Sequence, residues 1–170
     1  SKKMSPTMIS SGHEAPYTGL MYHWPGNNRM DEATLRTFQN LFHGRADIHV
    51  RRWLLPTLPS IVGKSVVPLR LFADNGSFAL ADAVLGLPAS ENGFLQPMPV
   101  RSGRFFQSDD AEEVVLTRGM ADALGVGPER LGEASIRFNN RTFAVVGILD
   151  DDEFIKIKDL NNHPLMPIKS

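Results

Sequence analysis

The stretch ASIRFNNRTFAVVG, residues 134–147, decides the fold. Apolar and polar residues alternate on both sides of Asn139-Asn140, and asparagine tolerates the positive φ angles of a type I′ turn. A two-residue loop pairs Ile136 with Phe143, so the apolar residues of both arms fall on one side. We therefore predict a β-hairpin that buries one face against an existing sheet. If Phe143 is fully buried there, Phe143→Ala should cost about 3–5 kcal/mol.

Three stretches upstream of this hairpin predict helices, because each begins with an N-cap residue and ends at a glycine. They are residues 31–44, 77–86 and 117–125. Apolar residues recur at helical spacing in the first of them.

Alternating apolar residues predict strands at 48–54 and 67–71, an aromatic stretch predicts one at 19–24, and a short apolar run predicts a buried one at 113–116. Pro68 cannot donate to a sheet ladder, so we expect an edge position for the strand that contains it. Residues 87–102 are rich in proline and lack a periodic pattern, which indicates a long surface excursion. Helices and strands in this order indicate the α+β class.

The composition excludes several classes of function. The 170 residues have a net charge of -1, which argues against a protein that binds nucleic-acid phosphates. The chain has no cysteine, so disulfides, thiolate metal sites and a cysteine nucleophile are excluded. No apolar run is long enough to span a bilayer.

No motif of a catalytic, nucleotide or metal site is complete. Val62-Gly63-Lys64-Ser65 resembles the end of a phosphate-binding loop, but Leu58 stands where the first glycine belongs, so we interpret it as a turn. The five histidines lack the spacing of a zinc site, and the acidic run 150–153 lacks calcium-loop spacing. A serine-hydrolase motif is also missing. We expect no enzymatic activity and no cofactor.

An aromatic group, Tyr22, Trp24 and Trp53, leaves two interpretations open. The rings could form a platform for sugars or peptides, or they could pack a small sheet. Alternation along a strand already accounts for Tyr22 and Trp24, which favours packing.

Residues from about 71 to 153 resemble the extracytoplasmic core domain of ABC-transporter permeases of the MacB and FtsX-like class. Five short motifs carry the resemblance in the family's order. They are the glycine-arginine-aromatic turn SGRFF at 102–106, the strand EVVLT at 113–117, the alanine-to-leucine-glycine helix at 121–125, the hairpin entry LGEASI at 131–136 and the hairpin exit FAVVGILD at 143–150.

The resemblance implies a domain inserted between two transmembrane helices, with two subdomains. We expect a membrane-proximal, sandwich-like α+β subdomain at 15–75 plus 133–155 and an inserted, β-rich distal subdomain at 76–132. Residues 1–14 would be an irregular lead-in, and 156–170 a tail leading to a transmembrane helix.

The resemblance also implies the function. The domain would hydrolyse nothing itself and would couple ATP hydrolysis by a cytoplasmic subunit to engagement of a partner outside the membrane. Its partners would be the transmembrane helices of the permease, the cytoplasmic ATPase, and a periplasmic adaptor or a protein or lipoprotein substrate. The full-length transporter would be a dimer, anchored on the periplasmic face of the cytoplasmic membrane.

Loops on a rigid scaffold commonly carry binding residues, so we predict partner contacts on the excursion 87–102 and the turn after it. The candidate residues are Phe94, Leu95, Met98, Arg101, Arg104 and Phe105. These side chains could instead fold back onto the domain. Two other functions stay open at this point. One is a free periplasmic binding protein for a small ligand or peptide, which needs a deep polar pocket. The other is an enzyme of another type, which needs a cleft with titratable groups whose pKa values are perturbed.

Overall fold

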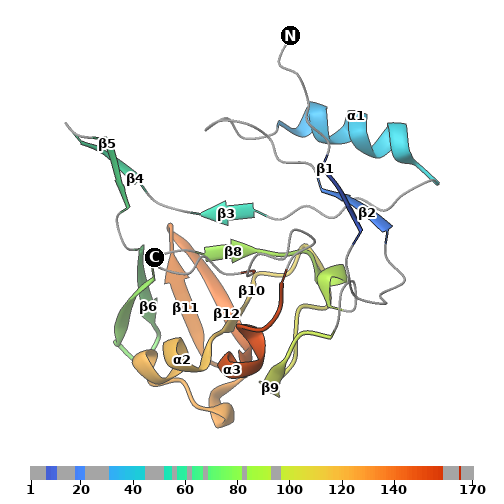
Figure 1. Cartoon of the computed structure of the whole chain (residues 1–170). Coiled ribbons are helices and arrows are strands. Elements are labelled where there is room, and N and C mark those ends of the chain that lie inside the picture. Colours follow the sequence, from blue (N-terminus) through green and yellow to red (C-terminus); the bar gives the residue numbers. More distant parts are fainter. Residues whose placement is uncertain are drawn as a thin grey trace. The chain divides into compact units, whose positions relative to one another are not determined.

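The computed structural model of the chain (Figure 1) describes residues 31–44, 69–81, 84–92, 97–158 and 165 with their side chains. It describes the strand backbone alone at 7–10, 18–21, 52–54, 57–60 and 63–66. The chain divides into two compact units, residues 1–48 with 157–170 and residues 49–156.

The first unit contains the predicted amino-terminal helix. Strands β1 (Thr7–Ser10) and β2 (Thr18–Met21) pair antiparallel. Helix α1 (Glu32–Phe42) begins after Asp31, whose Oδ1 accepts a hydrogen bond from the Thr34 amide at 2.6 Å. Gly44 follows the helix with φ of 70°. Both predicted helix ends are therefore confirmed.

A six-stranded sheet forms the second unit, in the order β10-β12-β11-β6-β7, with β9 paired to β12. Its strands are β6 (Leu69–Ala73), β7 (Phe78–Ala81), β9 (Val100–Gly103), β10 (Glu113–Leu116), β11 (Ser135–Phe138) and β12 (Arg141–Leu149). β10 runs parallel to β12, and the other pairs are antiparallel.

Two small ladders and four short helical elements complete this unit. The ladders pair β3 (Arg52–Leu54) with β8 (Val84–Gly86) and β4 (Thr57–Ser60) with β5 (Gly63–Val66). The helical elements are η1 (Ala89–Glu91), α2 (Arg118–Leu124), η2 (Pro128–Arg130) and α3 (Asp151–Phe154). The predicted strands 48–54 and 67–71 are confirmed at 52–54 and 69–71, and their other residues lie outside the described part; β2 likewise confirms the part of 19–24 that is described.

The hairpin predicted from 134–147 is present as β11 and β12. Asn139 and Asn140 have φ of 48° and 59°, as a type I′ turn requires. Ile136 lies opposite Phe143, which is the predicted register. Ile136 is only 1% exposed, but Phe143 is half-buried, stacked on Phe138 with ring centroids 4.5 Å apart. The expected full burial of Phe143 is therefore wrong, because this ring stacks on Phe138 beside the Asn139-Asn140 turn, at the margin of the buried face.

Helix α2 covers the inner face of the sheet, where it contacts β7, β10 and β12. The predicted ends of this helix are confirmed: the Thr117 hydroxyl accepts a hydrogen bond from the Met120 amide, and Gly125 has φ of 65°. Leu124 is fully buried, and the inner face of the sheet contributes Leu71, Ile136 and Val145 to the same core.

The helix predicted over 77–86 is wrong, since this stretch forms β7 and β8. The Gly76 amide donates to the Ala73 carbonyl, and Gly76 has φ of 86°, so residues 74–76 close a tight hairpin loop. β7 then pairs with β6 over its whole length. Tertiary pairing of alternating residues thus outweighs the helix propensity of alanine and leucine.

One prediction about the organisation of the sheet is wrong, and another is not confirmed. β6 lies between β11 and β7, so the edge position expected for the strand after Pro68 is wrong. The division into two subdomains is not confirmed, because β7, β9 and β10 from the expected distal subdomain pair within the same sheet as β6, β11 and β12.

Candidate functional site

The six predicted contact residues differ in how far their side chains are exposed and in whether the structure describes them. Phe94 and Leu95 lie outside the described residues. The side chains of Met98 and Phe105 are buried, with 8% and 7% exposure. Arg101 is exposed on β9, and Arg104 is partly exposed in the turn that follows. Among the described candidates, the two arginines are therefore the side chains available for contact.

Close backbone packing holds β9 against β12. Gly103 lies opposite Gly147, and the Arg104 amide donates to the Val146 carbonyl at 3.0 Å. A Cβ at Gly103 would overlap the Val146 carbonyl oxygen, and one at Gly147 would overlap the Arg104 carbonyl oxygen. The glycines of the SGRFF and VVG motifs are thus partners in one backbone contact.

A backbone hydrogen bond also joins the residue before β9 to the residue after β12. The Asp150 amide donates to the Pro99 carbonyl at 2.8 Å. Asn92 adds a side-chain bond, since its Oδ1 accepts from the Met98 amide at 2.8 Å. The end of the proline-rich excursion is therefore tied to the last residues of the longest strand.

An ion pair fixes the turn that follows β9. Arg104 Nη1 donates to Glu113 Oε2 at 3.0 Å, and Nη2 donates to Oε1 at 2.5 Å. Nη1 also donates to the Phe105 carbonyl at 3.1 Å. These hydrogen bonds to the carboxylate lower the pKa of Glu113. The sequence showed the arginine but carried no signal for its partner nine residues later.

We expect Glu113→Gln to change how the stability of the domain depends on pH. Because the folded-state pKa of Glu113 is lower than its ordinary value of 4.5, the ion pair stabilises the fold above that pH and is lost as the pH falls through the folded-state pKa. The variant should lose about 1 kcal/mol at neutral pH, as a half-exposed bidentate pair allows. Urea titrations at pH 7 and at acid pH should show that the free energies of unfolding of the variant and the unaltered protein become equal in acid. A difference that stays constant across this range would contradict the assignment.

Acidic residues after β12 accept hydrogen bonds from backbone amides at the beginnings of two helices. Asp151 accepts hydrogen bonds from the Arg118 and Gly119 amides at 2.6 and 3.0 Å, so its carboxylate caps the beginning of α2. Asp150 Oδ1 accepts from the Asp152 and Glu153 amides and caps α3. The acidic run 150–153, which lacks calcium-loop spacing, is thus the start of a helix, and its Asp151 carboxylate also bonds to α2.

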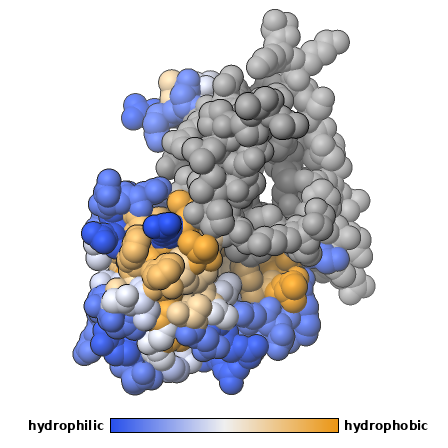
Figure 2. All heavy atoms as spheres, turned by 90° about the vertical axis from the view of Figure 1, so that its left-hand side faces the viewer, coloured by the Kyte–Doolittle hydropathy of each residue, from blue (hydrophilic) through white to orange (hydrophobic). Residues whose placement is uncertain are grey.

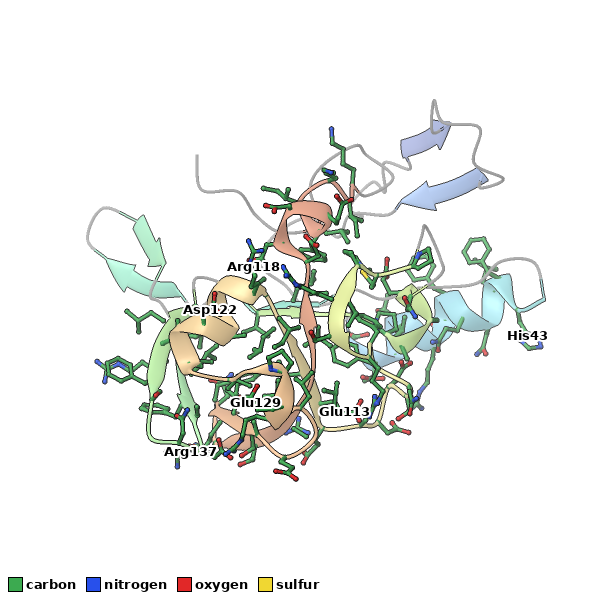
Figure 3. All side chains as sticks on the ribbon, turned by 90° about the horizontal axis from the view of Figure 1, so that it is seen from below. His43, Glu113, Arg118, Asp122, Glu129 and Arg137 are labelled. Carbon is green, nitrogen blue, oxygen red and sulfur yellow. The ribbon has the colours of Figure 1, made fainter. Side chains whose placement is uncertain are left out.

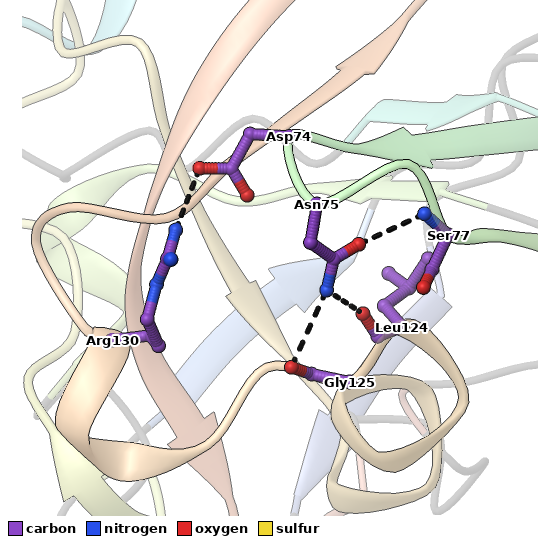
Figure 4. A network of polar contacts seen from close by, with 6 residues as sticks. All are labelled: Asp74, Asn75, Ser77, Leu124, Gly125 and Arg130. Atoms are coloured by element: carbon purple, nitrogen blue, oxygen red, sulfur yellow. Dashed lines mark hydrogen bonds and ion pairs between the residues drawn. The ribbon is translucent and has the colours of Figure 1, made fainter.

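A second network joins the β6–β7 turn to the other end of α2 (Figure 4). Asn75 Nδ2 donates to the Leu124 carbonyl at 2.9 Å, and its Oδ1 accepts from the Ser77 amide at 2.8 Å. Beside it, Arg130 pairs with Asp74 at 2.7 Å. The contacts of Asn75 with Leu124 and of Asp74 with Arg130 each join residues about fifty positions apart in the sequence.

Apart from the ion pairs above, the labelled titratable side chains of the second unit do not form a cluster. Figure 3 shows Glu113, Arg118, Glu129 and Arg137 on four different elements, with Asp122 on the same helix as Arg118, and they do not point toward one another. Within the described residues, no group of three or more histidine, aspartate or glutamate side chains could hold a metal ion. Gly63-Lys64-Ser65 lies in β5 of an antiparallel hairpin, not between a strand and a helix.

None of the helices in the described part of the chain is long and apolar enough to cross a membrane. Tyr22 and Trp24 lie outside the described residues, and only the backbone of Trp53 is described, in β3. The aromatic platform therefore stays a hypothesis.

Comparisons with known proteins identify the family. The family model for the MacB-like periplasmic core domain matches residues 7–167, nearly the whole chain. The comparisons with curated proteins and with solved structures gave no match. The family is not a catalytic one, and its place is outside the cytoplasm. The chain therefore belongs to the MacB-like periplasmic core domains, the extracytoplasmic domains of ABC-transporter permeases.

Proposed function

We propose that this domain works by contact, coupling ATP hydrolysis by a cytoplasmic ATPase to engagement of a partner outside the membrane. Membership of the permease family over residues 7–167 carries this proposal. The partner would be a periplasmic adaptor or a protein or lipoprotein substrate. The domain would be anchored through transmembrane helices of the permease and would act within a dimeric transporter.

The contact surface that we propose is the excursion 87–102 together with the turn after β9. Arg101 and Arg104 would supply charge, and Phe94 and Leu95 would supply apolar contact. The buried Met98 and Phe105 side chains would support the turn from below. Arginine and aromatic residues are the types that contribute most binding energy at protein interfaces.

The backbone connections of this segment suit a coupling role. β9 is bonded to the end of β12 through the Gly103–Gly147 contact, and β12 continues into α3. Residues 156–170 would then lead to a transmembrane helix. A displacement of that helix would reach the contact segment through one strand and one ladder, since packed elements move as rigid bodies.

The double variant Phe94→Ala with Leu95→Ala should abolish partner binding or transport by the full-length permease. We expect the melting temperature of the domain to stay within about a degree or two, as for other surface substitutions. Arg101→Glu should weaken partner binding in the same assay. Arg141→Glu, which changes an exposed arginine on the same sheet, is the matched control and should leave transport unchanged.

Two results would count against this assignment. If the double variant unfolds, the excursion is part of the core. If it stays folded and fully active, the contact surface lies elsewhere, and Tyr22, Trp24 and Trp53 become the next residues to test.

A further inference from the structure

The outer face of the β6–β7 hairpin exposes three large apolar side chains. Phe72, Phe78 and Leu80 are 40%, 61% and 55% exposed. Phe72 lies opposite Phe78, and opposite residues of antiparallel strands share a face. Figure 2 shows apolar side chains gathered over this part of the sheet. Scattered apolar residues on a surface are ordinary, but a contiguous group marks a site of interaction.

The charged residues on this face are arginines. Arg70 lies opposite Leu80, and Arg137 lies opposite Phe72 on β11. The guanidinium carbon of Arg137 lies 5.5 Å from the centroid of the Phe72 ring, a cation–π distance. Among the described residues that share this face on β6, β7 and β11, none is acidic. We call Arg70, Phe72, Phe78, Leu80 and Arg137 the outer hairpin face.

β7 also ends the sheet. Its only partner among the described strands is β6. The Ala73 amide donates to the Ser77 carbonyl at 2.8 Å, which makes these two a hydrogen-bonded pair. Hydrogen-bonded and non-bonded pairs alternate along an antiparallel ladder, so the amides of Phe78 and Leu80 point away from β6. An extended chain can pair with such an edge.

We propose that the outer hairpin face and the edge of β7 bind an extended segment of a partner protein that presents apolar and acidic side chains on the same face. Its backbone would pair with β7, and because every second residue of a strand shares a face, its apolar and acidic side chains would occupy alternate positions that point to the outer face. There the apolar side chains would cover Phe78 and Leu80, and the carboxylates would face the positive potential set up by Arg70 and Arg137. This surface is separate from the segment 87–106, and the proposal does not depend on that segment.

Charge argues against two other occupants. A second copy of the chain would bring arginines against arginines, because a two-fold interface joins the same patch of both subunits. The chain's own residues 45–68 are basic, with four arginine or lysine side chains against one carboxylate, so they do not complement this face either.

A short blocked peptide provides the test; valine, leucine and glutamate occupy every second position, so that they share one face of the strand, and threonine stands between them. Fluorescence anisotropy should show it binding to the 170-residue chain, whereas the matched peptide with lysine in place of glutamate should not bind. The double variant Arg70→Glu with Arg137→Glu should lower the affinity about tenfold or more, since it places like charges together. Arg141→Glu changes another exposed arginine, which lies off this face, and this variant should bind the peptide as the unaltered chain does. Amide exchange at Phe78 and Leu80 should slow in the complex.

The substituted side chains are exposed, so all variants should keep their melting temperatures. The proposal would be overturned if the glutamate peptide did not bind or if both peptides bound equally well. It would also be overturned if the double charge reversal left the affinity for the glutamate peptide unchanged. So would binding to phosphatidylglycerol vesicles that the double reversal abolishes, or a concentration-dependent dimer that Leu80→Arg disrupts, because those results identify a membrane or a second copy as the occupant.

Discussion

Gly103→Ala should destabilise the domain by about 2–5 kcal/mol, the sum of a backbone penalty and a steric one. Gly103 has φ of 76°, where an alanine costs about 1–2 kcal/mol. Its Cβ would also overlap the Val146 carbonyl oxygen and lie 2.8 Å from Leu131 Cδ1. Relief requires β9 and β12 to separate, and such overpacking typically costs about 1–3 kcal/mol. Urea unfolding followed by circular dichroism measures the loss.

Two matched glycine variants separate these contributions. Gly132 has φ of 88°, but a Cβ added there would meet no atom within 4 Å, so Gly132→Ala measures the backbone penalty alone. Gly147 does not have a positive φ, and its Cβ would overlap the Arg104 carbonyl oxygen, so Gly147→Ala measures the steric contribution alone. If Gly103→Ala lowers the free energy of unfolding no more than Gly132→Ala does, the close approach of β9 and β12 does not contribute to the loss of stability.

Local chemistry explains why part of the fold could be predicted from the sequence. The caps Asp31 and Thr117 act within three residues, so their side-chain chemistry alone marks the ends of α1 and α2. The Asn139-Asn140 turn likewise sets its own φ angles and, with them, the register of β11 and β12. The family resemblance followed from motifs of this kind.

Features that depend on distant pairing could not be predicted. Residues 78–81 have helix-forming composition, and only the ladder with β6 makes them a strand. The order of the sheet places β6 inside it and joins the two expected subdomains, and no local pattern encodes that order. The Arg104–Glu113 pair and the Asn75 contact with α2 also arise from the folded arrangement.

The contact surface had the weakest sequence signal. Large apolar residues near prolines suggested exposure, yet Met98 is buried, while the most exposed apolar group of the sheet lies on β7, in a stretch whose sequence predicts a helix. Burial of a side chain depends on which face of the sheet another element covers. Here α2 covers the inner face, and no described element covers Phe78 and Leu80.

Ile136→Ala should cost about 2–5 kcal/mol, and Phe143→Ala, directly opposite on the hairpin, should cost clearly less. Ile136 is 1% exposed and lies in the core with Leu124 and Val145, so its removal leaves a cavity that the sheet cannot close. Phe143 is half-buried, and its contacts with Phe138 and Arg141 lie at the end of the hairpin, where the backbone can adjust. The sequence analysis gave about 3–5 kcal/mol for Phe143→Ala on the condition of full burial, and alternation cannot tell the centre of a buried face from its margin. Equilibrium unfolding of both variants in urea measures the difference, and a loss at Phe143 equal to that at Ile136 would mean that the hairpin end is packed as tightly as the core.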